Sequence, residues 1–257
     1  MAPNADDFIR SALGFIANEL GVPIEFVDWM TWPEREAAFD QAQIDLVWIC
    51  GLPYVWKADA HPDTIRLLAA PVMAGERYRG QPHYFSDVIV QHASSYAVFE
   101  DLAGTTWGYN EPRSHSGYNI VRCELARRGL DSGFVGRRVA TGSHQASLEA
   151  LLQGRIDWTA IDSTVLETEC RRRPGLSSRL RVLEAFGPSP APPLIARAGF
   201  DPTLAAELQD MLTSMHGSQT GRSTLARHAV EKFEPVNDRS YDPIREMQRL
   251  ARSIDLS

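Results

Sequence analysis

Hydrophobic side chains recur every three to four positions between residues 8 and 20, which predicts an amphipathic helix. Gly21 and Pro23 follow as a glycine cap and a helix breaker, so the helix is expected to end there. Residues 24–29 then alternate between hydrophobic and polar side chains, as a half-buried strand does. The chain is therefore predicted to begin with a helix and a strand.

The next stretch continues this alternation of helix and strand. Thr31 and Glu34 form a capping box, with Pro33 near the start of the predicted helix. Residues 45–50 are almost continuously hydrophobic, which is expected of a strand buried on both faces of a parallel sheet. The turn at residues 51–54 leads into another short helix.

The second half of the chain repeats the same rhythm. Strands are predicted at residues 105–109, 138–141, 156–161 and 180–186, and helices at residues 117–128, 144–152 and 163–172. This β-α-β order predicts an α/β fold with open, right-handed sheets.

Two hydrophobic strands, residues 87–91 and 194–198, have no obvious partner within their own half of the sequence. We interpret them as two crossings between lobes, with the C-terminal helices near residues 204–215, 224–231 and 244–254 returning to the first lobe. Lobe 1 would comprise residues 1–88 and 194–257, and lobe 2 residues 89–193. Two such crossings make a hinge, and ligands of open sheets bind at the carboxyl ends of the strands.

Composition and charge narrow the possible functions. The 257 residues suffice for one large domain or two small lobes. The net charge of −7 argues against a nucleic-acid binder, which usually carries a basic face. No stretch approaches the roughly 18 hydrophobic residues that cross a bilayer, and the N-terminus lacks the pattern of an export signal.

The three cysteines are too few and too scattered for a disulfide framework, and their spacing fits no zinc motif. Cys50 lies in a hydrophobic run and is expected to be a buried, small side chain. We therefore expect neither a metal nor a cofactor. The tryptophans inside predicted strands are expected to belong to the core: Trp48, Trp107 and Trp158.

The polar turn at residues 110–119 is the strongest candidate for chemistry. It follows a predicted strand and opens a helix, so hydroxyls and free backbone N–H groups are gathered where a helix dipole favours an anion. Ser114 and Ser116 supply the hydroxyls, and Gly117 allows a ligand to approach the backbone closely. Both serines are also common helix N-caps, which is the simpler interpretation.

Three segments together resemble the phosphate-, phosphite- and phosphonate-binding proteins of ABC transporters, a branch of the type II periplasmic binding fold. They are residues 45–54, residues 84–90 with 99–104, and residues 114–119 followed by 141–144 and 160–162. Their order and spacing agree with that family over roughly residues 2 to 190. The resemblance implies a receptor that closes two lobes around a small oxyanion or organophosphonate. We expect it to be a monomer and, if it is exported, to deliver the ligand to an ABC transporter permease.

The resemblance also implies a set of ligand-binding residues. In the family, hydroxyls and N–H groups of a Ser-x-Ser-Gly-Tyr helix start hold the anion, two tyrosines line the cleft, and a Ser-His pair and a carboxylate complete the site. The matching positions in this sequence are Tyr54, Tyr84, Ser114, His115, Ser116, Gly117, Ser143, His144 and Asp162.

Several of these residues have an ordinary structural alternative. Tyr54 and Tyr84 are equally consistent with core packing. His144 either donates to an anion or lies on the surface at a helix start, and His115 either contacts the ligand or points to solvent.

Asp162 follows a predicted strand and would cap the next helix. As a ligand group, its carboxylate would repel a bare phosphate and pair with an amine, so Asp162, and with it Glu111, would favour an aminoalkylphosphonate. Arg113 offers a fork for an oxyanion or is a solvated loop residue. Asn4 either caps the first helix or contacts the ligand.

Two further function classes stay open. Ser116, His144 and Asp162 are the residue types of a catalytic triad, although no nucleophile-elbow motif surrounds the serine. The family begins with a strand that runs into an Ala-Pro-Asn turn, and Met1 stands where that strand should end. The protein is therefore expected to be extracytoplasmic if a leader was removed, and a cytoplasmic anion sensor if Met1 is the true start.

Overall fold

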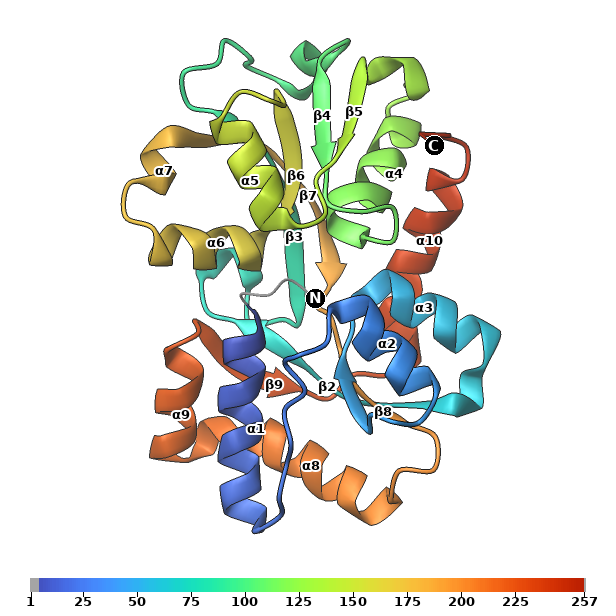
Figure 1. The fold of residues 1–257 in the computed structure, drawn as a ribbon, viewed down its shortest axis with the longest axis vertical. Helices are drawn as coiled ribbons and strands as arrows, with labels where there is room; N and C mark the ends of the chain where they lie inside the picture. Colours follow the sequence, from blue (N-terminus) through green and yellow to red (C-terminus); the bar gives the residue numbers. More distant parts are fainter. Residues whose placement is uncertain (1–4, 257) are drawn as a thin grey trace. The chain divides into compact units, whose positions relative to one another are not determined.

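The computed structural model describes residues 5–256, which form two compact α/β units, each with its own sheet (Figure 1). Unit 1 contains the described residues up to His83 together with Pro190–Asp242. Unit 2 contains Tyr84–Ser189 and the residues from Pro243 onward. The chain thus passes between the units after His83, after Ser189 and after Asp242.

The sheet of unit 1 has four strands in the order β1-β8-β2-β9, and neighbouring strands are antiparallel. The strand β1, predicted to be buried on both faces of a parallel sheet, is instead a half-buried edge strand that pairs with β8. Its Cys50 neighbour is likewise only partly buried. The strands are β1 (Leu46–Trp48), β2 (Ile65–Met73), β8 (Leu194–Arg197) and β9 (Val230–Glu234).

The helices of unit 1 follow the predicted sequence signals. The first helix ends at Gly21, which adopts a left-handed conformation, and the second begins with the capping box of Thr31 and Glu34. The helix α8 lies against β2 and β9, and α1 lies against α8 and α9. The helices are α1 (Asp6–Leu20), α2 (Trp32–Asp40), α3 (Gly51–Ala60), α8 (Pro202–Ser214) and α9 (Gln219–Ala226), with short 3-10 turns at Pro62–Thr64, Glu76–Tyr78, Met215–Gly217 and Asp238–Tyr241.

One predicted strand of unit 1 does not form. The predicted strand, residues 24–29, has no ladder partner among the described residues, although burial alternates along residues 22–26 as it does in a strand. A strand is stabilised by pairing with a neighbouring strand, so this stretch is irregular because it lacks such pairing.

The sheet of unit 2 has five strands in the order β5-β4-β6-β3-β7. The strand β4 is parallel to β5 and β6, whereas β3 runs antiparallel to β6. The strands predicted at residues 87–91 and 194–198 find their partners in the other half of the sequence, because β3 pairs with β6 and β8 pairs with β1 and β2. The strands are β3 (His83–Gln91), β4 (Thr106–Tyr109), β5 (Arg137–Ala140), β6 (Trp158–Asp162) and β7 (Leu180–Pro190).

Helices cover both faces of the unit 2 sheet (Figure 1). On β3, Val88 and Val90 pack with the helices α4 and α10, whereas Ile89 packs with α5 and α6. Trp107 and Trp158 are fully buried on the α4 side, as predicted. The helices are η5 (His115–Asn119), α4 (Ile120–Arg127), α5 (His144–Leu152), α6 (Ser163–Arg172), α7 (Leu176–Arg179) and α10 (Asp242–Ala251), with 3-10 turns at Phe99–Leu102 and Ser132–Phe134.

The C-terminal part of the chain departs from the prediction in two places. Residues 244–254 were expected in lobe 1, but Met247, Ala251 and Ile254 are buried in the hydrophobic core of unit 2. The predicted helix at residues 224–231 ends earlier, because Val230 begins the strand β9 beside β2. Within the described part of the chain, no helix is long and apolar enough to span a bilayer.

Candidate anion-binding site

The polar turn after β4 opens a helix, as predicted. The residues His115–Asn119 form one π-helical turn, η5, which continues directly into α4. The Gly117 N–H donates to Ser114 Oγ at 3.0 Å, so Ser114 is the N-cap of this helix. Ser114 is buried with the whole turn that follows it. The predicted capping role of Ser114 is therefore confirmed, which leaves Ser116 as the hydroxyl not used as a cap.

The hydroxyl of Ser116 pairs with a histidine from another helix. Ser116 Oγ lies 3.0 Å from His144 Nε2, although 28 positions separate the two residues. The ring of His144 is held at the first position of α5, where Ser143 Oγ accepts the Ala146 N–H at 3.0 Å as the N-cap. The structure thus brings together Ser116 and His144, two of the residues that the sequence singled out.

His144 is a neutral imidazole at physiological pH. Only 7% of its surface is exposed, and burial lowers its pKa from 6.5 to about 3. When Ser116 donates its hydroxyl proton to Nε2, the ring proton lies on Nδ1 and is available to an acceptor. His144 Nδ1 is buried without a hydrogen-bond partner among the described residues.

Gly117 lies where Asn110 and His144 converge. A Cβ atom at position 117 would lie 2.0 Å from Asn110 Oδ1 and 3.2 Å from His144 Cε1. Asn110 Oδ1 is also buried without a hydrogen-bond partner in the described part of the chain. Buried polar atoms are rarely left unpaired in proteins, so two of them beside one glycine mark a place built for a polar ligand.

His115 does not point to solvent, so that interpretation is wrong. Its side chain is fully buried, with Nε2 at 3.1 Å from Ser189 Oγ and Nδ1 at 3.2 Å from Asn119 Nδ2. Burial lowers the pKa of His115 to about 3, so this ring is also neutral. Both ring nitrogens are engaged by protein groups, and His115 ties the turn to β7.

Asp162 ends β6 and caps α6, as its structural alternative predicted. Its Oδ1 accepts the Thr164 N–H at 2.8 Å and the Thr164 hydroxyl at 2.7 Å. The pKa of Asp162 is raised to about 6, chiefly by burial and to a smaller extent by the Asp87 carboxylate, while hydrogen bonds from Thr164 and Val165 oppose the rise. Asp162 is therefore a buried carboxylate that changes its charge just below neutral pH.

Ser86 is opposite Asp162 in the register of β3 and β6, so both side chains emerge on the same face of the sheet. This is the face that carries Val88, Val90 and the helix α4 that follows η5. Ser86 is fully buried, and its hydroxyl has no hydrogen-bond partner among the residues that the structure describes.

The two tyrosines are core residues of different units. Tyr54 lies in unit 1, where its hydroxyl donates to Asp238 Oδ1 at 2.9 Å and its ring packs on Tyr241 at 4.5 Å. Tyr84 is buried at the start of β3 in unit 2. Their core packing is confirmed, and a joint role in holding one ligand stays a prediction.

The remaining candidates are more exposed or lie outside the description. Arg113 is exposed and Glu111 is half-buried. Asn4 lies outside the described residues. No group of three or more histidine, cysteine or carboxylate side chains within residues 5–256 could hold a metal ion.

Sequence reasoning placed Asn110 in the polar turn but selected neither Asn110 nor Ser86 as a residue of the candidate site. Asn110 directly follows β4, and its backbone carbonyl accepts the Gly142 N–H at 2.9 Å. A polar residue directly after a strand of an open sheet was the available signal for Asn110. Ser86 lies inside a hydrophobic strand, where only its place opposite Asp162 indicates a role.

The two α/β units, one with an antiparallel sheet and one with a mixed sheet, define the type II periplasmic binding fold, with the polar turn at the start of η5 as its candidate binding site. The chain belongs to the family of periplasmic substrate-binding proteins of phosphonate ABC transporters, whose model matches residues 11–241.

Several solved structures have the same fold. A binding-protein component of an ABC phosphonate transporter from Pseudomonas aeruginosa superposes with a TM-score of 0.82 at 20% identity, over 98% of this chain and 83% of that chain. PhnD1 from Prochlorococcus marinus, in complex with methylphosphonate, also gives 0.82, at 17% identity, over 98% of this chain and 94% of its own. A Xanthomonas citri protein bound to ATP superposes with a TM-score of 0.70 at 16% identity, over 98% of this chain and 94% of that chain.

Proposed function

We propose that unit 2 binds the oxyanion head of a small phosphonate at the start of η5, and that the protein delivers this ligand to an ABC transporter permease outside the cytoplasm. The observation that carries the proposal is the convergence of Gly117 with two unpaired buried polar atoms, His144 Nδ1 and Asn110 Oδ1. Family membership and the methylphosphonate bound to the related PhnD1 support the ligand class.

The turn can bind an anion without a positively charged side chain. Ser116 orients the His144 ring so that Nδ1–H can donate to a phosphonate oxygen. Backbone N–H groups and the positive end of the helix that starts at η5 add favourable electrostatics. The Asn110 amide can present its NH₂ group to the same anion after a rotation of its side chain.

A thermal-shift screen tests the ligand class. A ligand present at a hundred times its dissociation constant adds about 2.7 kcal/mol to the free energy of unfolding. We expect methylphosphonate and other small phosphonates to raise the melting temperature, and chloride at the same ionic strength to leave it unchanged. A screen in which no phosphonate, phosphite or phosphate shifts the melting temperature would contradict the proposal.

Replacing Ser116 with alanine is expected to weaken phosphonate binding by about 1–3 kcal/mol, because the ring of His144 loses the partner that fixes its proton on Nδ1. Isothermal titration calorimetry measures the loss. The matched control is Ser223→Ala, which removes an exposed serine hydroxyl from a helix of unit 1 and should leave the affinity unchanged. Equal affinities of the two variants would mean that Ser116 only packs against His144.

We further propose that Asp162, with Ser86 opposite it, selects a phosphonate whose tail carries an amine. A partly desolvated carboxylate attracts an ammonium group and repels a second phosphonate charge. Asp162→Asn keeps a side chain that can cap α6 but removes the charge, so the preference for 2-aminoethylphosphonate over methylphosphonate should fall at least tenfold by calorimetry. Asp201→Asn, at the equivalent cap of α8 in unit 1, should leave that preference unchanged. An Asp162→Asn protein with the wild-type preference would refute this role.

The 3.0 Å contact between Ser116 Oγ and His144 Nε2 also favours a hydrolase as the second candidate. Two observations weigh against it. An imidazole with a pKa of about 3 is a weak general base at neutral pH, and Asp162 Oδ1 is bonded to Thr164 rather than to the ring. Release of the alcohol from phosphonate or phosphate esters, lost in His144→Ala, would establish the enzyme instead.

A further inference from the structure

Four buried side chains of unit 2 form a chain of hydrogen bonds that begins in the turn η5. Asn119 Nδ2 lies 3.2 Å from His115 Nδ1, and His115 Nε2 lies 3.1 Å from Ser189 Oγ. The hydroxyl of Ser189 in turn donates to Met247 Sδ at 3.8 Å. All four side chains are buried, and they come from three elements, η5, β7 and α10. The turn that carries Ser116 is thus bonded to segments far away in the sequence.

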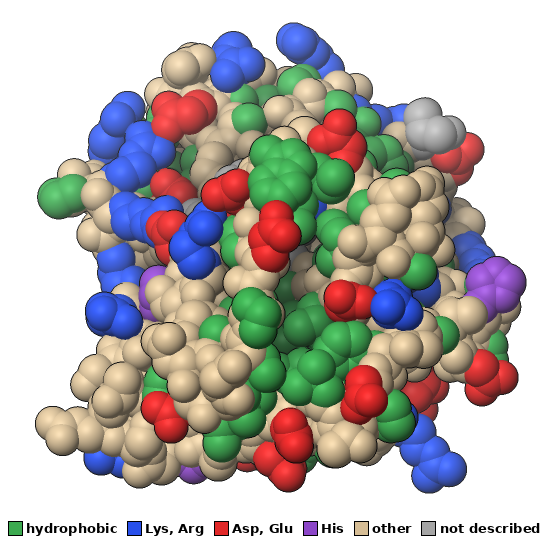
Figure 2. Space-filling model, turned by 60° about the horizontal axis from the view of Figure 1, so that its bottom comes forward, with side chains coloured by type: hydrophobic (Ala, Val, Ile, Leu, Met, Phe, Trp, Pro, Cys, Tyr) green, Lys and Arg blue, Asp and Glu red, His purple; other side chains and the backbone are tan. Residues whose placement is uncertain are grey.

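These hydrogen bonds have one consistent direction. Asn119 Nδ2 can only donate, so His115 Nδ1 accepts. Burial lowers the pKa of His115 to about 3, so the neutral ring has a single proton, which lies on Nε2 and is donated to Ser189 Oγ. None of the four side chains is charged, whereas Figure 2 shows charged side chains at the surface. The direction of the bonds is therefore set by buried groups that stay neutral around pH 7.

The turn that these bonds support has an unusual width. The Asn119 N–H donates to the Ser114 carbonyl at 3.0 Å, and the Ile120 N–H donates to the His115 carbonyl, so both bonds span five residues. Such π-helical turns are rare and short, because the four-residue spacing of the α-helix is ordinarily preferred. The side-chain bonds of His115, one to the last residue of the same turn and one to β7, favour the wider spacing.

The position of Ser116 depends on this spacing. Ser116 follows His115 directly, and its Oγ lies 3.0 Å from His144 Nε2. The two buried histidines therefore hold their protons on opposite nitrogens, His115 on Nε2 and His144 on Nδ1. A turn with α-helical spacing would rotate Ser116 about the helix axis and away from the ring of His144.

We propose that Asn119, His115 and Ser189 are positioning residues, whose hydrogen bonds hold η5 in the spacing that presents Ser116 to His144. Without the Ser189 hydroxyl, the Nε2–H of His115 would be buried without an acceptor. The ring would then turn, or its proton would move to Nδ1 and face the donor of Asn119. Either response displaces the turn. The effect on affinity rests on the function proposed for unit 2, but the contact between Ser116 and His144 is present without ligand.

The variant Ser189→Ala tests this role in the full chain. Nitrogen-15 spectra of the ligand-free protein show which ring nitrogen of each histidine carries the proton, and His115→Gln and His144→Gln assign the two rings. We expect the wild type to hold the proton on Nε2 of His115 and on Nδ1 of His144. In Ser189→Ala, the signals of His144 should change towards a mixture of the two tautomers, and the affinity for methylphosphonate should fall at least fivefold by calorimetry.

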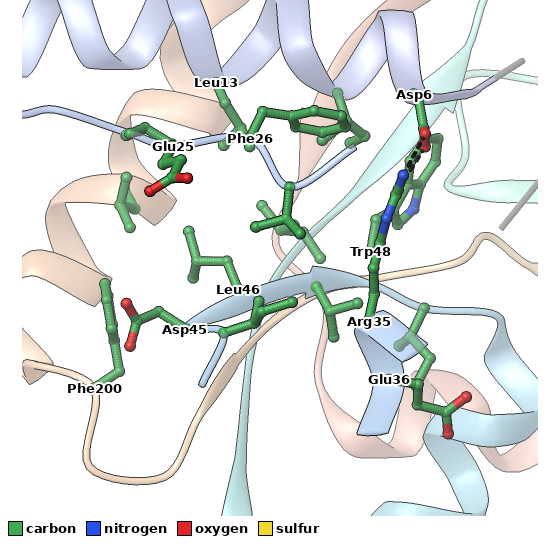
Figure 3. A pocket seen from close by; sticks show the side chains of 18 of the residues that line it. Asp6, Leu13, Glu25, Phe26, Arg35, Glu36, Asp45, Leu46, Trp48 and Phe200 are labelled. Atoms are coloured by element: carbon green, nitrogen blue, oxygen red, sulfur yellow. Dashed lines mark hydrogen bonds and ion pairs between the residues drawn. The ribbon is translucent and has the colours of Figure 1, made fainter. Parts of the chain in front are cut away.

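Two control variants separate positioning from a general loss of stability. Leu13 is a buried residue of α1 that lines a cavity of about 430 Å³ in unit 1, together with residues 22–27 and β1 (Figure 3). Leu13→Val removes one methylene group there and should lower the melting temperature. Thr105→Val removes a hydroxyl just before β4, at the opposite end of this strand from Asn110. Both controls should keep the wild-type signals of His144 and the wild-type affinity.

Two outcomes would overturn the proposal. One is a wild-type protein with the His115 proton on Nδ1, because the bonds would then run in the opposite direction. The other is a Ser189→Ala protein with unchanged signals of His144, since the bonds would then stabilise unit 2 without positioning Ser116. If the signals of His144 change in Ser189→Ala but the wild type binds no phosphonate, the positioning role is supported and the ligand proposed for unit 2 is rejected.

Discussion

Replacing Gly117 with alanine is expected to weaken phosphonate binding at least a hundredfold. The new Cβ atom would lie 2.0 Å from Asn110 Oδ1 and 3.2 Å from His144 Cε1, far inside contact distance for the first. Asn110 and His144 would have to move away from the start of η5, which would displace the two side chains proposed to bind the ligand. A hundredfold change corresponds to about 2.7 kcal/mol of binding free energy.

Calorimetric titration of Gly117→Ala with methylphosphonate measures this loss. The matched control is Gly133→Ala in the same unit, where the Cβ would lie 3.0 Å from Asp131 Oδ1 at the exposed cap of a 3-10 turn. The control should bind like the wild type. If Gly117→Ala is folded by circular dichroism and binds with wild-type affinity, the ligand does not lie at this turn.

The free energy of unfolding is expected to fall by about 3 kcal/mol between pH 7 and pH 5. The folded-state pKa values of His115 and His144, lowered to about 3, lie below the unfolded value of 6.5, so their stabilising effect is present above pH 6.5 and is lost as the pH falls. Each histidine contributes a loss of about 2 kcal/mol at pH 5. Asp162 acts in the opposite sense, because its pKa is higher in the folded state, about 6, than its ordinary value of 3.8. Its protonation between pH 7 and pH 5 therefore raises the free energy of unfolding by about 1 kcal/mol.

Urea unfolding at pH 7 and pH 5 tests this dependence. The double variant His115→Gln with His144→Gln carries no titrating ring at either position, and its stability should change little or rise slightly over this range. His92→Gln is the control, because His92 lies outside the buried network, and it should retain the wild-type pH dependence. Wild-type stability that is equal at the two pH values would show that the two histidines are not held neutral.

Local sequence signals predicted the helices well. The bounds of α5 and α6 are as predicted, because each begins with an identifiable cap, Ser143 and Asp162 respectively. The first helix ends at its predicted glycine cap, Gly21. These signals act within one turn of helix, so they need no knowledge of distant parts of the chain.

The failures of prediction concern pairing between distant segments. Residues 24–29 have the sequence pattern of a strand but no ladder partner within residues 5–256, and β1 has the pattern of a central strand but lies at an edge of the described sheet. The helix α10 has an amphipathic pattern that fits either unit, and only the structure shows its hydrophobic face packed on the core of unit 2. Periodicity gives the face that a segment buries but does not identify what covers it.

In the candidate site too, the local features were predictable from the sequence and the contacts between distant segments were not. The turn at Ser114 and Gly117 was predictable, because a polar loop between a strand and a helix has a local signature. The pairing of Ser116 with His144 was not, because it depends on how the turn before η5 and the start of α5 meet in space. The inward orientation of His115 depends on Ser189, which lies 74 positions away.

Calorimetric titration of the wild-type protein with methylphosphonate at pH 7.5 tests the central claim most directly, provided that Ser116→Ala and Gly117→Ala are titrated in parallel. We predict saturable binding of one ligand per chain, weakened about 5- to 150-fold by Ser116→Ala and at least a hundredfold by Gly117→Ala. The account would be contradicted by a wild-type protein that binds no phosphonate, or by three proteins that bind it with the same affinity.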